Sequence, residues 1–224
     1  MLCIGRIQTG NGSHCTPRPL AFRIDHHRVP APELQLDIYL HVKVLLSMIL
    51  GLAIAQLLRG VSRIVQHPQK FPVYWVHLIW TLFLFLYLVH FWWWEFALER
   101  IAQWTFPLYF FLAVYATLLY LICSLFFPDE IDEYEGFRNY FYYRRKWLFA
   151  FMIIVFSLDF VDTAIKGPSY RAQFGTVANV RDAVFIVLCL LAMQIGNRFF
   201  QATFACLAVS LEILYILKTS LTLS

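Results

Sequence analysis

Charged side chains are scarce in this chain of 224 residues. Asp, Glu, Lys and Arg together make up 14% of it, whereas 60% is hydrophobic and 18% is aromatic. The mean hydropathy is +0.63. A soluble globular domain carries about 25% charged residues to keep its surface hydrated, so the composition excludes that class. The sequence therefore predicts an integral membrane protein.

The sequence also lacks the short motifs that mark common catalytic and nucleotide-binding sites. It contains no GxSxG, HExxH, Walker or GxGxxG pattern. Its five cysteines form no CxxC pair, which gives no sign of a zinc site or a disulfide framework. We therefore predict no cofactor and no metal site, and the sequence favours a protein that is not an enzyme. A membrane enzyme with its catalytic groups inside helices stays open.

Six apolar runs have the length and composition of membrane-spanning helices. A hydrocarbon core of about 30 Å requires about 20 helical residues. The predicted spans are residues 38–58, 72–94, 104–127, 147–165, 183–196 and 200–217. The fifth run is short, so its helix must include Arg181 and Asp182 or Asn197 and Arg198, or the run must be a re-entrant segment. The expected fold is all-α, a polytopic transmembrane helix bundle of about six spans.

Three consecutive tryptophans end the second predicted span. An indole ring is apolar but carries one N–H donor, so it prefers the headgroup boundary of a bilayer. Trp92, Trp93 and Trp94 are therefore predicted to anchor a membrane edge. Glu95 and Glu99, which follow them, are predicted to meet water there.

Residues 1–37 differ in composition from the rest of the chain. They are rich in glycine, proline and scattered basic residues, and they have no apolar core of a signal peptide. We expect a disordered tail, or a start placed upstream of the true one. A transmembrane domain over residues 38–220 is expected to follow it.

Basic residues in the short loops give a small bias in orientation. The loops after the first, third and fifth spans carry slightly more Lys and Arg than the opposite face, as the rule for cytoplasmic loops requires. This favours a cytoplasmic position for those loops and an outer position for both termini. The basic residues of the tail reverse the bias if they are counted.

The loop over residues 129–146 changes in character along its length. Its first half is acidic, and its second half mixes aromatic residues with Arg138, Arg144, Arg145 and Lys146. Such a mixture suits a short helix in the headgroup layer, with its cations on lipid phosphates or on a protein partner. The acidic half lacks the spacing of a calcium loop. Because the basic segment is short and lies between spans, nucleic acid is not an expected ligand.

This loop and the stretch "PVYWVHLIW" resemble segments of small multipass bacterial inner-membrane proteins. The resemblance covers about residues 38–220. It implies a location in a bacterial inner membrane and nothing about activity.

Ionisable residues inside the predicted spans are the candidates for function. Each costs roughly 2.5–3.5 kcal/mol at the bilayer centre, so such residues are seldom present without a role. By helical rise, Asp159 and Glu212 both lie about 18 Å from the face at which their spans begin. The other candidates are placed toward the same far side. The predicted polar cluster comprises Glu212, Asp159, His90, Lys43, Arg181, His41 and Asp162.

Three interpretations of this cluster remain open. We expect Glu212 to pair with Lys43 or Arg181, and Asp159 to pair with His90, while Asp162 and Lys166 have the spacing of a salt bridge on one helix. These pairs can serve only to fasten helices together. They can also line a water-filled vestibule for protons or cations, or His41 and His90 can hold a metal or haem.

Two functions follow from these interpretations. The first is a small transporter or channel-like protein that handles protons or cations at the polar cluster. The alternative is a non-catalytic membrane subunit or sensor that binds anionic lipid or a protein partner through the basic segment. Gly51 and Ala55 have small side chains four residues apart, which allows close helix packing in a homo-oligomer.

Overall fold

The protein is a bundle of long helices. The computed structural model describes residues 31–69, 73–101, 103–129 and 131–221. Six helices are long and apolar enough to cross a membrane, which confirms the expected all-α fold with its six spans. They are α1 (Ala31–Gln66), α2 (Trp75–Trp94), α3 (Phe106–Phe126), α4 (Phe137–Ile165), α6 (Thr176–Gln194) and α7 (Arg198–Leu221). The short elements are η1 (Glu95–Arg100), η2 (Asp132–Tyr134), α5 (Pro168–Tyr170) and η3 (Arg171–Gly175).

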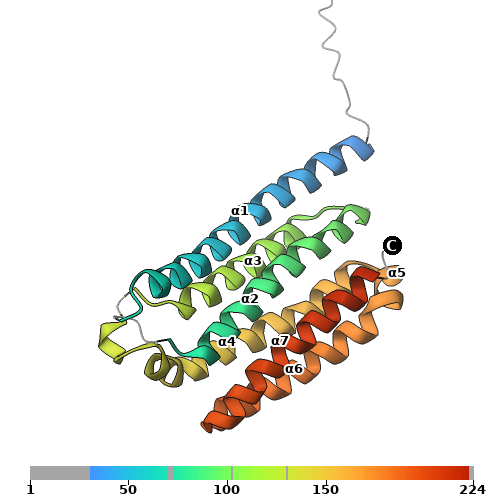
Figure 1. The fold of residues 1–224 in the computed structure, drawn as a ribbon. Helices are drawn as coiled ribbons and strands as arrows, with labels where there is room; N and C mark the ends of the chain where they lie inside the picture. Colours follow the sequence, from blue (N-terminus) through green and yellow to red (C-terminus); the bar gives the residue numbers. More distant parts are fainter. Residues whose placement is uncertain (1–30, 70–72, 102, 130, 222–224) are drawn as a thin grey trace, which may run out of the picture.

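Helix α2 lies in the middle of the bundle. It packs against α1 and α3 on one side and against α7 and α4 on the other (Figure 1). Helix α1 is paired mainly with α3, and α4 is paired mainly with α6. Because successive spans run in opposite directions, the last turns of α2 and α4 lie at the same end of the bundle as the start of α6. This arrangement is what assembles the polar site described below.

The outward faces of the helices are apolar. On α1, the exposed side chains include Leu40, Val44, Met48 and Leu52, which recur every four residues along one face. Helices α6 and α7 expose valines and leucines in the same way. Continuous apolar surface of this extent is unfavourable in water and favourable in hydrocarbon. The protein is therefore a multi-pass membrane protein.

Several helix boundaries differ from those predicted. Helix α1 begins at Ala31, so residues 31–37 belong to the first helix and not to the predicted tail. Helix α4 begins at Phe137, ten residues before the predicted span. Helix α6 begins at Thr176 and includes Arg181 and Asp182, one of the options that its length required. Helices continue into the headgroup region when their polar turns are hydrated there, and hydropathy does not mark such ends.

Two predictions fall on parts of the chain that the structure does not describe. Residues 1–30, most of the expected tail, lie outside the described residues, and so does Pro72 at the expected start of the second span.

Aromatic rings fill the half of the bundle that is remote from Ala31 and Leu221, the two ends of the described chain. Trp80 is fully buried, and its ring meets those of Phe149 and Phe204 edge to face, with centroids 5.4 and 5.0 Å apart. Closer to the middle, Phe156 and Phe185 stack at 4.8 Å. We call this region the aromatic half. Its packing fixes the relative positions of α2, α4, α6 and α7.

Two side chains close the hairpin between α6 and α7. The amide of Gln201, which is completely buried, donates to the carbonyl oxygens of Ala192 at 2.9 Å and Ile195 at 2.8 Å. The guanidinium of Arg145 donates to the Met193 carbonyl at 3.3 Å. Both supply donors to carbonyls at the end of α6, where the helix itself has none to offer.

Candidate functional site: a buried ionic network

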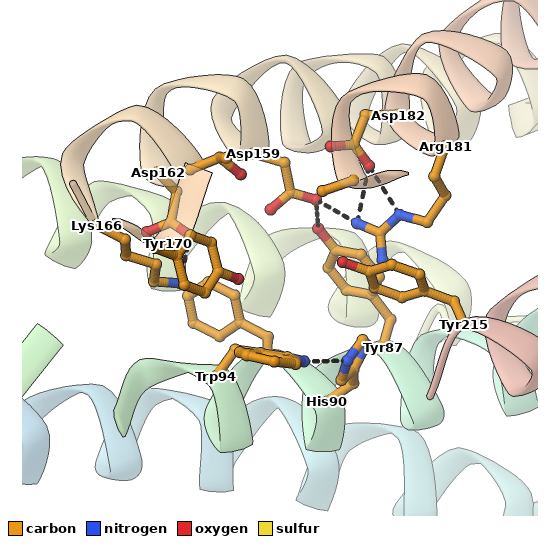
Figure 2. Close-up of a pocket in the computed structure, with 13 residues that line it drawn as sticks. Tyr87, His90, Trp94, Asp159, Asp162, Lys166, Tyr170, Arg181, Asp182 and Tyr215 are labelled. Atoms are coloured by element: carbon orange, nitrogen blue, oxygen red, sulfur yellow. Dashed lines mark hydrogen bonds and ion pairs between the residues drawn. The ribbon is translucent and has the colours of Figure 1, made fainter. Parts of the chain in front are cut away.

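A group of ionisable side chains is enclosed at the end of the bundle that carries both ends of the described chain. They come from the last turns of α2, α4 and α7, from the beginning of α6 and from η1 (Figure 1). Figure 2 shows those that line a cavity among them. We call this group the charged end. Its members are His90 near the end of α2, Glu95 at the start of η1, Asp159, Asp162 and Lys166 near the end of α4, Arg181 and Asp182 on α6, and Glu212 on α7.

Arg181 is the centre of the larger part of this network. Its guanidinium lies 3.0 Å from a carboxylate oxygen of Asp159, 2.8 Å from Asp182 and 3.6 Å from Glu212. The side chain is 12% exposed, and those of Asp182 and Glu212 are fully buried. Its guanidinium carbon also lies 4.3 Å from the ring centre of Tyr215, within cation–π range. One cation thus joins three helices.

Two tyrosines hold the carboxylate of Asp159. The hydroxyl of Tyr87 donates to Oδ2 at 2.6 Å, and the hydroxyl of Tyr115 on α3 donates to Oδ1. The two hydroxyl oxygens are 2.9 Å apart. Each phenol carries one proton and is buried, so Asp159 receives three donors including Arg181. Hydrogen bonds of this kind stabilise an ionised carboxylate inside the bundle.

His90 connects Glu212 to the indole of Trp94. Its Nδ1 lies 2.9 Å from Glu212 Oε1, and its Nε2 accepts from the Trp94 indole N–H. An indole nitrogen can only donate, so Nε2 carries no proton in this arrangement. The single ring proton is then on Nδ1, which donates to Glu212. A second proton on Nε2 would break the contact with Trp94 (Figure 2).

Lys166 is the centre of a second ionic group. Its ammonium lies 3.1 Å from Glu95 and also contacts Asp162, four residues earlier on α4. Burial alone would lower the pKa of Lys166, but the charges of Asp162 and Glu95 raise it above its usual value. Lys166 therefore keeps its charge. The contact with Asp162 has the expected spacing, although it is buried and not at a hydrated surface.

Glu95 does not meet water as the sequence suggested. It is 2% exposed and points into the bundle toward Lys166. The reason is local: the chain tightens from α2 into η1 at this residue. The prediction for Glu95 was wrong because the tryptophans before it were interpreted as the end of the span.

The charged end has more acids than bases. Five carboxyl groups belong to it, from Glu95, Asp159, Asp162, Asp182 and Glu212, against two permanent cations, Arg181 and Lys166. Four of these acids have a buried oxygen with no hydrogen-bond partner among the residues that the structure describes: Glu95, Asp162, Asp182 and Glu212. Full ionisation would leave three uncompensated negative charges away from water, which costs several kcal/mol each. Protons or another cation are therefore required to neutralise the surplus negative charge of the network.

A small cavity lies between the two ionic groups. It has about 40 Å³ of space and is lined by His90, Asp159, Asp162, Lys166 and Arg181 among others (Figure 2). A cavity needs roughly 10–15 Å³ to hold one water molecule, so this one has room for a few. Water here would reach the carboxylates of both groups.

The structure brings most of the predicted cluster together, with different partners. Glu212 contacts Arg181, one of its two expected partners, while His90 contacts Glu212 and not Asp159. Lys43 lies elsewhere, with its ammonium 3.6 Å above the ring of Phe96. His41 is exposed on α1 and lines no part of the cavity. The exposed position of His41 therefore gives no support to a metal or haem held between His41 and His90.

The three tryptophans occupy different environments. Trp93 is half exposed, and Trp92 is 38% exposed with its indole N–H donating to Ser47 at 3.0 Å. Trp94 turns inward to His90. A role as membrane anchors thus stays a prediction for Trp92 and Trp93, whereas Trp94 belongs to the site.

The sequence did not reveal several members of the site. Tyr87 and Tyr115 were hidden within apolar runs, where a tyrosine gives the same hydropathy signal whether or not its hydroxyl has an acidic partner. Asp182 was considered only as a possible end of the fifth span. A useful signal was the pair Arg181–Asp182 directly before an apolar run that is too short to span alone.

The predicted basic segment is part of α4 and not a separate helix. Arg138 and Lys146 are exposed. Arg144 donates to the hydroxyl of Tyr134 at 3.0 Å, and Arg145 reaches the end of α6. Two of the four cations therefore have partners within the protein, and two are available to lipid.

The described part of the chain contains no group of three or more His, Cys, Asp and Glu side chains placed to hold a metal ion. Comparisons with protein-family models, with curated proteins and with solved structures found no match. Functional inference therefore depends on the geometry of the charged end.

Proposed function

We propose that this protein is a small proton-handling transporter of a bacterial inner membrane, with the charged end as its proton-binding site. The observation that carries the proposal is the surplus of five buried carboxyl groups over two cations. Ion pairs that only fasten helices would be expected to balance, because each unpaired buried charge is costly. A surplus of acids is the arrangement expected of a site that takes up and releases protons.

Protons fit the site better than a metal ion does. Hydrogen bonds join Tyr115 to Asp159 and Asp159 to Arg181, and a separate one joins Glu212 to His90. Arg181 and Glu212 are 3.6 Å apart, which is an ion-pair distance, and the guanidinium keeps its proton. An acid and a histidine in contact, as Glu212 and His90 are, can pass a proton between them. A metal ion would instead require several oxygen or nitrogen ligands around one point.

The position of the site favours a carrier over an open channel. The cavity lies among the charged residues, and the aromatic half blocks the remaining depth of the bundle. Along α2, Trp80 and His90 are ten residues apart, or about 15 Å by helical rise. A proton that enters from the side of the termini would need a rearrangement of these rings to leave on the other side. Such alternating access is how carriers couple movement to binding.

Reconstituted vesicles provide the test. We expect the wild-type protein to dissipate an imposed pH gradient, reported by an internal pH dye, faster than empty vesicles do. Glu212→Gln and Asp182→Asn should each lower that rate by about tenfold or more, because each removes an acid that has a buried oxygen without a hydrogen-bond donor and is therefore able to hold a proton. Glu133→Gln, a change of an exposed acid in the connection before α4, is the matched control and should have the wild-type rate.

The outcomes separate clearly if the variants elute as folded, monodisperse protein. Equal rates for the wild type and both variants would reject the proposal. A wild-type rate equal to that of empty vesicles, with the gradient imposed in either direction, would also reject it.

A second candidate is a sensor or subunit that reads anionic lipid. The observation in its favour is that Arg138 and Lys146 are exposed on α4, where Lys146 is followed in sequence by the exposed Trp147. Cations next to an exposed indole suit the headgroup layer. This surface lies at the opposite end of the bundle from the charged end, so the two functions can be tested separately.

A further inference from the structure

We infer that a hollow beside the charged end binds a quaternary or primary ammonium group. The hollow, here called the aromatic vestibule, has a volume of about 660 Å³. Its walls are Trp93, Trp94, Phe96, Tyr170 and Phe174, with Glu99 as the acid. Pockets that hold small organic ligands in proteins have about 300–1,000 Å³, so the vestibule is of suitable size.

The rings of the aromatic vestibule are packed into one wall. The ring of Trp94 meets those of Phe174 and Tyr170 edge to face, with centroids 4.9 and 5.6 Å apart. Trp93 and Phe96 meet in the same manner at 5.5 Å. These contacts come from the end of α2, η1, α5 and η3. They hold several electron-rich rings beside one space, and ammonium groups bind over the faces of such rings.

Charge complementarity identifies the ligand as a cation. Among the described residues that line the vestibule, Glu99 is the one charged side chain, and it is exposed. The protein's own ammonium groups already use two rings of this wall: Lys43 lies 3.6 Å above Phe96, and Lys166 lies 5.6 Å from the ring centre of Tyr170. Trp93, Trp94 and Phe174 remain for a ligand. A neutral ligand would gain only apolar contact with these rings, and an anion would be repelled by Glu99, so a cation is the ligand that gains from both.

The vestibule adjoins the charged cavity. Trp94 and Tyr170 line both spaces. An ammonium ligand in the vestibule would therefore contact the same indole that donates to His90. The inference itself does not depend on proton transport, because the binding wall contains none of the acids of the proton site.

Calorimetric titration of the purified protein in phosphatidylglycerol nanodiscs tests the inference. The probe is choline, and its control is dimethylbutanol, in which carbon replaces the quaternary nitrogen. We expect choline to bind roughly tenfold more tightly than the neutral analogue, since only the cation interacts with the ring faces and with Glu99. Equal affinities, or no binding of choline, would overturn the inference.

Variants localise the binding. Trp93→Ala and Glu99→Gln, both changes of exposed side chains, should each weaken choline binding several-fold. Trp147→Ala removes an exposed tryptophan near the opposite end and should leave it unchanged. If Trp147→Ala weakens binding as much as Trp93→Ala, the ligand is not in the vestibule. Glu212→Gln should bind choline like the wild type, so loss of proton flux and loss of choline binding are separate results.

A change of lipid in the nanodiscs shows whether the ammonium group belongs to a lipid headgroup or to a free molecule. In phosphatidylcholine nanodiscs a lipid headgroup would compete, and free choline would bind several-fold more weakly than in phosphatidylglycerol. An unchanged affinity would assign the vestibule to a free organic cation. Both results support recognition of an ammonium group and differ only in its origin.

Discussion

The aromatic half and the charged end are built on the same helices but from different chemistry. Helix α4 places Phe149 in the aromatic half and Asp159 in the charged end, and α7 does the same with Phe204 and Glu212. The change from rings to charges occurs at a similar depth on each helix. Packing of rings specifies how the helices fit together, whereas the buried charges are costly there and point to function.

The same comparison predicts how each region fails. The charged end depends on a few cations that hold several acids, so loss of one cation should have a large effect. The aromatic half depends on many close contacts, so one misfit should have a moderate effect. The exposed basic residues near the start of α4 support neither region.

Replacing Arg181 should have the largest effect. Arg181→Leu would leave Asp159, Asp182 and Glu212 together without their cation, and truncation of one partner in a buried ionic group costs about 3–5 kcal/mol. Thermal unfolding of the purified protein in detergent measures the loss. Adding Asp182→Asn to Arg181→Leu should restore part of the stability, because one of the stranded acids is removed. An Arg181→Leu protein as stable as the wild type would contradict this account of the charged end.

A methyl group at Gly60 should have a moderate effect. A Cβ atom there would come within 2.1–2.4 Å of the ring of Phe127 in the aromatic half. The ring is buried and cannot move freely, so Gly60→Ala should destabilise the protein by about 1–3 kcal/mol. Gly51→Ala is the matched control on the same helix, since a Cβ atom there meets nothing within 4 Å. Equal unfolding temperatures for the two variants would show that this contact is not tight.

Neutralising the exposed cations should have the smallest effect. Arg138→Gln with Lys146→Gln should leave unfolding unchanged and reduce the amount of phosphatidylglycerol that co-purifies. Each basic residue near an anionic surface contributes about 1 kcal/mol to such binding. Native mass spectrometry measures the bound lipid. If the double variant co-purifies with as much phosphatidylglycerol as the wild type does, the second candidate function is rejected.

The sequence predicted the depth of the polar residues better than it predicted their partners. Helical rise placed Asp159 and Glu212 on the same side of the bilayer, and the structure joins both to Arg181. Residue spacing could not show whether Lys43 pairs with Glu212. That depends on which helices are neighbours, and no pattern in the sequence indicates that α1 packs mainly against α3. Neighbour relations among apolar helices depend on shape, which hydropathy does not record.

Residues at the ends of helices were the hardest to predict. Glu95 follows three tryptophans, and the same sequence fits a hydrated end or a turn directed inward. The structure shows the second because η1 continues the chain around the bundle and Lys166 offers a cation. Tyr87 and Tyr115 were missed for a related reason. Their role as hydrogen-bond donors depends on Asp159 lying beside them, which the sequence does not show.

The central claim is that the charged end holds protons on its surplus acids. Infrared spectroscopy of the purified protein at neutral pH tests this most directly, because a protonated carboxyl group has its own C=O band, which shifts in heavy water. We predict such a band in the wild-type protein, altered in Asp182→Asn or Glu212→Gln and unchanged in Glu133→Gln. A spectrum in which every carboxyl group of the wild-type protein is ionised would contradict the account.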